Sequence, residues 1–184
     1  KIIEYTPATD KNILKRKINN LIKRYKFIKK YKNKFDFSAS FATYSLPASF
    51  MARTCSKNNA IWGHADYLSL YNNDKDKMKN FFDKRKIKKF KKIIFVSKEG
   101  KESFIAVYPK LKDRVITCNN LVNDKRILNQ AEEPVKDLKK ENVVTFLNVG
   151  RHDERQKKLT RIIYSAEQLK KDNKKFRIIF IGDG

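Results

Sequence analysis

Short apolar runs that alternate with amphipathic stretches constrain what this chain can fold into. Apolar runs that end in small or polar residues lie at 35–40, 60–63, 93–97, 115–118, 143–149 and 176–181. Apolar residues recur at helical spacing most clearly at 75–90, 98–107 and 154–172. Continuous apolar strands between amphipathic helices predict an α/β fold, with a parallel sheet covered on both faces.

One segment interrupts this rhythm and predicts a boundary between two lobes. Residues 129–142, "NQAEEPVKDLKKEN", are polar, mix acids with bases and include Pro134. A helix and a loop within one domain fit this segment, and so does a linker. We predict a first lobe at 1–130, a linker at 131–142 and the start of a second lobe at 143–184. The second lobe has one strand-helix-strand unit, so we expect it to be incomplete.

The chain is strongly basic, with a formal net charge of +24. Nucleic acid, anionic lipid and a phosphorylated small molecule all fit this charge, but lysine, asparagine and isoleucine are abundant everywhere, which indicates a general compositional bias. Residues 12–31 predict a helix with an apolar face and a lysine-rich face. Such a helix can lie on an anionic membrane, although a charged face is more often only solvated.

Several features narrow the class of protein. No apolar run approaches the length of a membrane-spanning helix, no signal peptide is visible, and the two cysteines form no CxxC. We therefore expect a cytoplasmic protein. Motifs of P-loop enzymes, zinc proteases and serine hydrolases are missing, as are known nucleic-acid modules and any metal-ligand cluster.

The stretch "FLNVGRHDERQKKL" predicts an anion site. Gly150 permits a tight turn after a strand, Asp153 is placed to cap the following helix, and Gln156 stands at capping-box spacing. Arg151 and Lys157 then lie around a helix amino terminus, which itself favours negative charge. The pattern favours a phosphate site at the carboxyl edge of a parallel sheet. An exposed turn with incidental basic residues fits it equally well.

Two other strands end in residues that suit a ligand site. "FIGDG" places Gly182 and Gly184 where backbone can approach a nucleotide closely, although plain turns use such glycines constantly. "AIWGHADY" delivers His64 and Asp66 to a strand end, and imidazole can donate or accept a hydrogen bond near neutral pH. A lone histidine is more often structural.

The motifs occur in the order of a known enzyme family. "IWGHADY", "IIFVSKEGKESF", "VITCNNLVN", "FLNVGRHDERQKKLTRII" and "FRIIFIGDG" together resemble the middle of family-four retaining glycosyltransferases with the two-lobed B fold. The resemblance covers about residues 58–184 and is nearest to bacterial capsular and cell-surface polysaccharide transferases. It implies two Rossmann-like lobes that face each other across a cleft. It also implies a nucleotide-sugar donor, UDP-linked, a glycan or lipid-linked acceptor, and neither a metal nor another cofactor.

The resemblance implies roles for individual residues. Arg151 and Lys157 match the basic pair that holds the donor diphosphate, although the usual spacing is one residue shorter, which leaves Lys158 as a competitor. His64 matches the catalytic histidine beside the transferred sugar, and Asp66 follows it on the acceptor side. Other positions that match donor-binding residues are Gly150, Gly182, Gly184 and Asn120. In "NNLVN", Leu121 replaces a proline and Asn123 replaces an acid.

The same resemblance implies that parts of the family pattern lie outside this sequence. A glycine-rich first loop is expected upstream and a Glu-x7-Glu stretch downstream, so we expect a central portion of an enzyme that is inactive alone. Two other functions stay open, a basic nucleic-acid-binding protein and a non-catalytic glycosyltransferase-like scaffold lobe. We expect no nucleic-acid partner for the transferase, and a peripheral contact with the inner face of an anionic membrane fits its lipid-linked acceptors.

Overall fold

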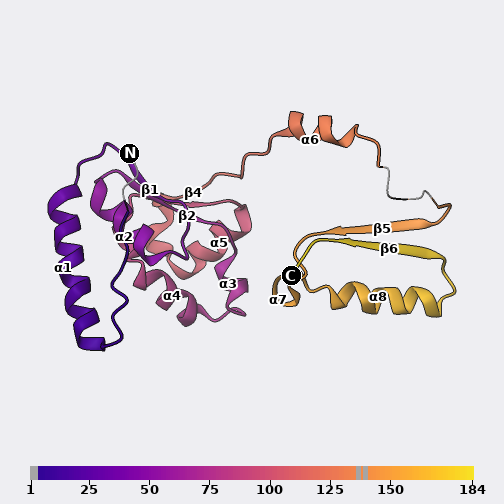
Figure 1. The fold of residues 1–184 in the computed structure, drawn as a ribbon, viewed down its shortest axis with the longest axis horizontal. Coiled ribbons are helices and arrows are strands. Elements are labelled where there is room, and N and C mark those ends of the chain that lie inside the picture. The colour runs from indigo at the N-terminus through magenta and orange to yellow at the C-terminus, as the bar shows by residue number, and fades with distance from the viewer. Residues whose placement is uncertain (1–3, 136–137, 139–140) are drawn as a thin grey trace. The chain divides into compact units, whose positions relative to one another are not determined.

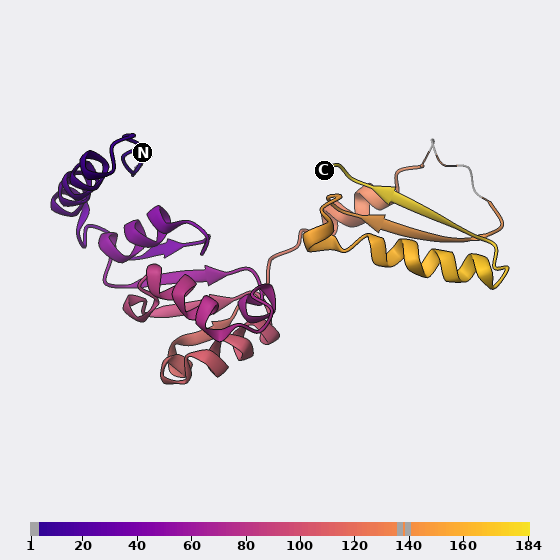
Figure 2. The same ribbon diagram turned by 90° about the horizontal axis from the view of Figure 1, so that it is seen from below.

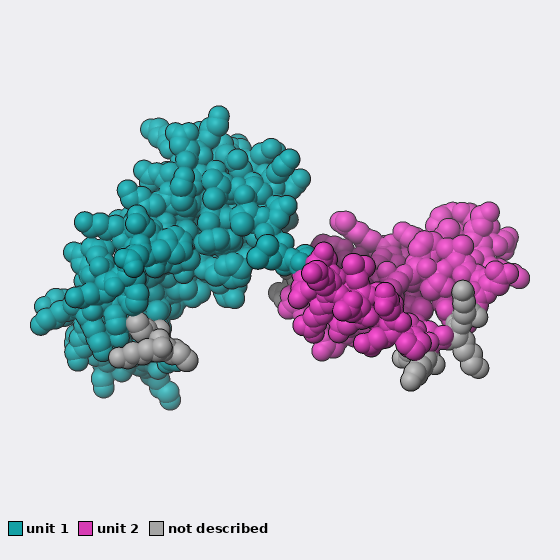
Figure 3. All heavy atoms as spheres, turned by 90° about the horizontal axis from the view of Figure 1, so that it is seen from above, with its two compact units in different colours: residues 1–122 teal, residues 123–184 magenta. Residues whose placement is uncertain are grey.

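The chain has an α/β fold with two separate parallel sheets, as predicted (Figure 1). A computed structural model describes residues 4–135, 138 and 141–184, with only the backbone of Arg155 and Gln156. The chain divides into two compact units, unit 1 at Lys1–Val122 and unit 2 at Asn123–Gly184 (Figure 3). The linker at 131–142 includes residues outside those described, so these lobe boundaries stay a prediction.

Unit 1 contains a four-stranded sheet in which sequence order equals spatial order. The strands are β1 Ser38–Ser40, β2 Asn59–Gly63, β3 Lys92–Phe95 and β4 Val115–Thr117. All neighbours are parallel, with Ile61 beside Ile93 and Ile93 beside Val115. Parallel pairing brings the carboxyl ends of all four strands to one edge.

Five α-helices and two short 3-10 helices connect and flank these strands in the described part of unit 1. They are α1 Ile13–Tyr31, α2 Leu46–Cys55, α3 Tyr67–Leu70, α4 Lys75–Lys84, η1 Ile87–Lys89, α5 Lys98–Val107 and η2 Pro109–Arg114. The pattern at 98–107 predicts α5 to the residue. The sequence predicts a helix to residue 90, but α4 ends at Lys84. The helix stops there because Lys86 adopts a left-handed backbone with φ of 55°.

The core of unit 1 is rich in aromatic rings. Phe82 of α4 contacts Phe104 of α5 edge to face at 5.1 Å between ring centroids, and Phe104 contacts Phe95 of β3 at 5.2 Å. Ile61 and Ile93 of the sheet belong to the same buried cluster. Helices α4 and α5 therefore cover the same face of the sheet, whereas the apolar runs predict helices on both faces. Strands that are added in one direction by right-handed crossovers place their helices on one side.

Unit 2 has little interior. Its two strands, β5 Val144–Val149 and β6 Phe176–Ile181, are parallel and match the predicted runs closely. Its helices are α6 Asp124–Ala131, α7 Glu154–Lys157 and α8 Thr160–Lys171. Helix α8 runs alongside β5 and β6 (Figures 1 and 2). None of the side chains that the structure describes in unit 2 is buried, as expected for two strands and one covering helix.

The described helices include none that is long and apolar enough to cross a membrane.

Gly63, the last residue of β2, is required by the ring of Phe95. A Cβ at position 63 would lie 2.6 Å from Cε1 and 2.9 Å from Cδ1 of this ring. Phe95 is 1% exposed and is held by Phe104, so it has no room to withdraw.

We expect Gly63→Ala to destabilise unit 1 by about 1–3 kcal/mol, because the new methyl group overpacks the core. Urea unfolding followed by the fluorescence of Trp62, the single tryptophan, measures this loss. The control is the same change in a Phe95→Leu background, where the smaller side chain leaves room. An equal cost in both backgrounds would contradict the clash.

Candidate functional site

The two glycine turns that follow β5 and β6 lie side by side. Backbone pairing continues beyond the strands, with the Gly150 N–H donating to the Ile181 carbonyl at 2.9 Å and the His152 N–H donating to the Asp183 carbonyl at 2.8 Å. The parallel register, which pairs Val149 with Ile181, carries both turns to the same place. The sequence motifs around residues 150 and 182 thus form one surface rather than two.

Gly182 allows these turns to approach each other. A Cβ at position 182 would lie 1.9 Å from the Gly150 carbonyl oxygen, which no side chain can tolerate. A Cβ on Gly184 would lie 3.0 Å from the His152 nitrogen, a milder conflict. The glycines predicted to approach a nucleotide therefore also approach the neighbouring backbone.

Two cations, Lys157 and Arg151, flank the turn that follows β5. The side chain of Lys157 folds back over Gly150, where its Cε and Nζ would lie 3.4 and 3.7 Å from a Cβ on that glycine. Arg151 is the next residue in the turn and is exposed. The adjacent Lys158 adopts a left-handed backbone with φ of 54°. The structure thus associates Lys157, rather than Lys158, with Gly150.

The sequence predicts one continuous helix at 154–172, and this is wrong. The structure has two helices, α7 and α8, with a break between them. At the break, the Glu154 carboxylate accepts the Thr160 N–H at 3.0 Å and the Thr160 hydroxyl at 2.6 Å. These hydrogen bonds lower the pKa of Glu154. Glu154 therefore supplies the anion at the start of α8, and only the one-turn α7 begins beside Arg151. Asp153 directly precedes α7, and the Gln156 side chain lies outside the described residues.

His64 follows β2 in unit 1 and is held by a backbone carbonyl. Its Nε2 lies 2.7 Å from the Phe41 oxygen, and the Phe41 ring packs edge-on against the imidazole at 4.6 Å. A carbonyl can only accept, so Nε2 carries the proton in this hydrogen bond. Nδ1 is left as the ring's other polar atom, an acceptor in the neutral imidazole.

The loop that holds His64 depends on a buried arginine that the sequence did not single out. Arg85 is 6% exposed and donates to the carbonyls of Thr43, Tyr44 at 3.1 Å and Phe81 at 2.6 Å. Its guanidinium also lies over the Phe81 ring at 3.4 Å. Burial lowers the pKa of Arg85. Since Arg85 fixes residues 43 and 44, it also fixes the segment that presents the Phe41 carbonyl.

Asp66 caps helix α3. Its Oδ1 accepts the N–H groups of Leu68 at 3.0 Å and Ser69 at 3.3 Å, and its Oδ2 accepts the Ser69 hydroxyl at 2.6 Å. Burial raises the pKa of Asp66, but hydrogen bonds from Ser69, Ser103 and Leu68 together lower it. Both carboxylate oxygens thus have structural partners, and a role toward an acceptor stays a prediction.

The predicted turn after β4 is an extended, exposed segment. Asn120 is exposed, and Leu121 is fully so. Asn123, which stands in place of an acid, caps α6 by accepting the Arg126 N–H at 3.0 Å. The donor-binding role of Asn120 stays a prediction. Among the residues that the structure describes, there is no group of three or more side chains that could hold a metal ion.

Comparison with protein-family models finds no match for this chain, and comparison with curated proteins finds none either. The site is therefore interpreted from its own chemistry and from the order of its motifs.

We expect Gly182→Ala to disrupt unit 2 far more than Gly150→Ala does. A Cβ at position 182 meets backbone, whereas a Cβ at position 150 meets only the flexible end of Lys157. The two glycines have similar φ angles of 149° and 158°, so the comparison isolates the close approach. Hydrogen exchange of β5 and β6, followed by mass spectrometry, measures the effect. Equal loss of protection in both variants would contradict it.

We expect Asp66→Ala to destabilise unit 1 by about 1 kcal/mol at pH 7, because it removes a helix cap. The folded-state pKa of Asp66 is lowered, so its contribution is complete above the unfolded pKa of about 3.9 and is lost as pH falls through the folded pKa. The difference between wild type and variant should therefore shrink below about pH 4. Urea unfolding by Trp62 fluorescence at several pH values checks this, with Asp113→Ala in η2 as the charge-matched control. A constant difference would contradict it.

Proposed function

We propose that this chain carries the donor-binding and catalytic residues of a family-four retaining glycosyltransferase. The enzyme moves a sugar from a UDP-linked donor to a glycan or lipid-linked acceptor of a surface polysaccharide. The observation that carries this proposal is the paired glycine turns of unit 2, flanked by Arg151 and Lys157 at the carboxyl ends of two parallel strands. Ligands of open α/β sheets bind at such strand ends.

The chemistry of the donor explains why cations belong at this turn. In the reaction, the bond between the sugar C1 and the diphosphate oxygen breaks, and negative charge accumulates on the leaving diphosphate. Arg151 and Lys157 stabilise that charge, and a single well-placed donor of this kind contributes roughly 3–4 kcal/mol in an enzyme site. Close backbone approach at Gly182 keeps this surface free of side chains that would fill the diphosphate position.

His64 orients the sugar in this proposal. With Nε2–H committed to the Phe41 carbonyl, Nδ1 is the atom that meets a sugar hydroxyl. Arg85 is a positioning residue that acts through the loop and does not touch the substrate. The acceptor hydroxyl oxygen bonds to C1 on the face that the diphosphate leaves, and its proton passes to the diphosphate oxygen. No redox step or further reactant is needed.

We expect the chain to bind UDP saturably and uridine much more weakly, because the turn recognises the diphosphate. Arg151→Ala should weaken UDP binding at least about tenfold, the loss of one charge-assisted contact. Titration calorimetry measures both affinities. Arg161→Ala in α8 removes the same charge from the same unit and should leave the affinity unchanged.

Two results would contradict the proposal. Equal weakening by Arg151→Ala and Arg161→Ala would show that net charge alone attracts the nucleotide. Equal affinity for UDP and uridine would show that the diphosphate is not recognised.

A further inference from the structure

Helix α1 packs against the rest of unit 1 through two asparagines and the aromatic rings of Phe27 and Tyr31. Asn20 accepts the Ala8 N–H at 2.9 Å, and Asn19 donates to Asp10 at 2.9 Å. Phe27 is the one buried residue of the helix, packed 5.6 Å from the Phe50 ring of α2. The residues that attach α1 therefore lie on one side and include two asparagines.

The apolar side of α1 is exposed instead. Leu14 is 71% exposed, Leu21 67% and Tyr25 66%, against 6% for Phe27. At 100° per residue, six of the seven exposed large apolar residues of α1 fall within about a third of the helix circumference, and only Ile13 at its first position lies outside. We name this set the α1 stripe: Leu14, Ile18, Leu21, Ile22, Tyr25 and Ile28. A stripe of this kind normally faces a core, and here none of the described residues buries it.

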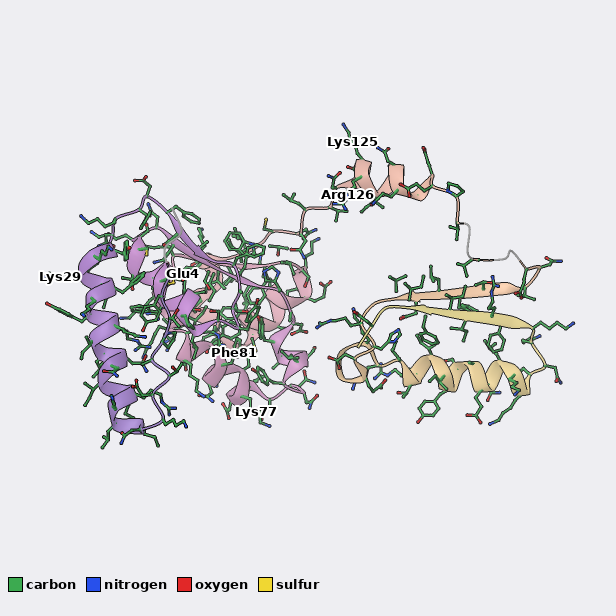
Figure 4. All side chains as sticks on the ribbon, viewed as in Figure 1. Glu4, Lys29, Lys77, Phe81, Lys125 and Arg126 are labelled. Carbon is green, nitrogen blue, oxygen red and sulfur yellow. The ribbon has the colours of Figure 1, made fainter. Side chains whose placement is uncertain are left out.

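Basic residues border the α1 stripe on both sides. The same geometry places Lys17 and Arg24 along one edge and Lys15 and Lys26 along the other, while Lys29 lies within the stripe near its second edge. The helix holds eight lysines and arginines in 19 residues and no acid. Lys29 projects from the outer side of α1 in Figure 4. An apolar strip with cations at both margins matches an anionic interface that has an apolar layer beneath it.

We propose that α1 docks unit 1 on a bilayer that contains anionic lipid. The helix lies in the plane of the interface, with the α1 stripe in the boundary between headgroups and acyl chains. Lysine and arginine stems cover the apolar margin while their charged ends reach the lipid phosphates.

Other partners fit the α1 stripe less well. A nucleic-acid duplex would use the cations but leave the six apolar side chains in water. A second copy would cover the stripe but bring eight positive charges of each helix together, which repel. A bilayer with anionic headgroups satisfies both features at once. This docking belongs to unit 1 and does not depend on the function proposed for the turns of unit 2.

Vesicle sedimentation of the full chain tests the proposal without nucleotide present. Vesicles of phosphatidylcholine alone are compared with vesicles that contain one-third phosphatidylglycerol. We expect strong binding only to the anionic vesicles. The stripe variant Leu14→Ser/Leu21→Ser/Tyr25→Ser should lower the partition coefficient at least about 100-fold, because three apolar side chains no longer enter the interface.

A second variant measures the contribution of the charges to vesicle binding apart from that of the α1 stripe. Lys15→Gln/Lys17→Gln/Lys26→Gln should lower partitioning on the order of 100-fold, from the loss of three cations at the surface. Lys84→Gln/Lys89→Gln/Lys112→Gln removes the same net charge from exposed positions elsewhere in unit 1 and should retain most of the binding. Ile127→Ser/Leu128→Ser/Tyr164→Ser is the matched apolar control in unit 2.

The outcomes decide between the partners. Equal binding to neutral and anionic vesicles, or equal losses from the α1 variants and their controls, would overturn the proposal. So would a stripe variant that binds vesicles normally but no longer self-associates in sedimentation velocity, since the stripe would then join two copies. All the substituted side chains are exposed, and circular dichroism melting verifies that each variant is folded.

Discussion

Parallel strand pairing is the constraint on which both candidate sites depend. Parallel strands end at a common edge, so residues that directly follow them become neighbours even when they are far apart in sequence. In unit 2 this pairing extends past the strands and holds the turns at Gly150 and Gly182 together. In unit 1 it brings His64 to the edge that also carries Phe41, after β2 and β1 respectively. Without the parallel register, each motif would be an isolated loop.

The sequence predicted the elements whose boundaries are set by local signals. Strand β6 and helix α5 agree with the pattern to the residue, since an apolar run broken only by Arg177 defines the strand and a serine cap defines the start of the helix. The break at Lys158 and Leu159 was not predictable from periodicity, because Leu159 lies in the break and still keeps a helical spacing with Ile162. The hydrogen bonds that Thr160 donates to the Glu154 carboxylate make the interruption possible, and no simple pattern encodes them.

The candidate site also divides into residues that local sequence signals predict and residues that only contacts in the fold reveal. His64 and Arg151 were predicted because they follow strands, and Lys157 because it lies near the start of the next helix, but Arg85 was not predicted. It lies in "DKRKIKKF", where four other basic residues have the same apparent character. Its role arises from burial next to Phe81 and from carbonyls more than 40 positions earlier, contacts that only the fold creates. Spacing within a sequence cannot distinguish one such cation from its neighbours.

The absence of buried side chains among the described residues of unit 2 has a thermodynamic consequence. A unit with so little interior has a small free energy of unfolding, because burial supplies most of the stabilisation of a fold. A molecule that binds only the folded form adds about 2.7 kcal/mol at a concentration one hundred times its Kd. For unit 2 that increment is a large share of the total free energy of unfolding. A molecule that occupies its turns therefore also stabilises its fold.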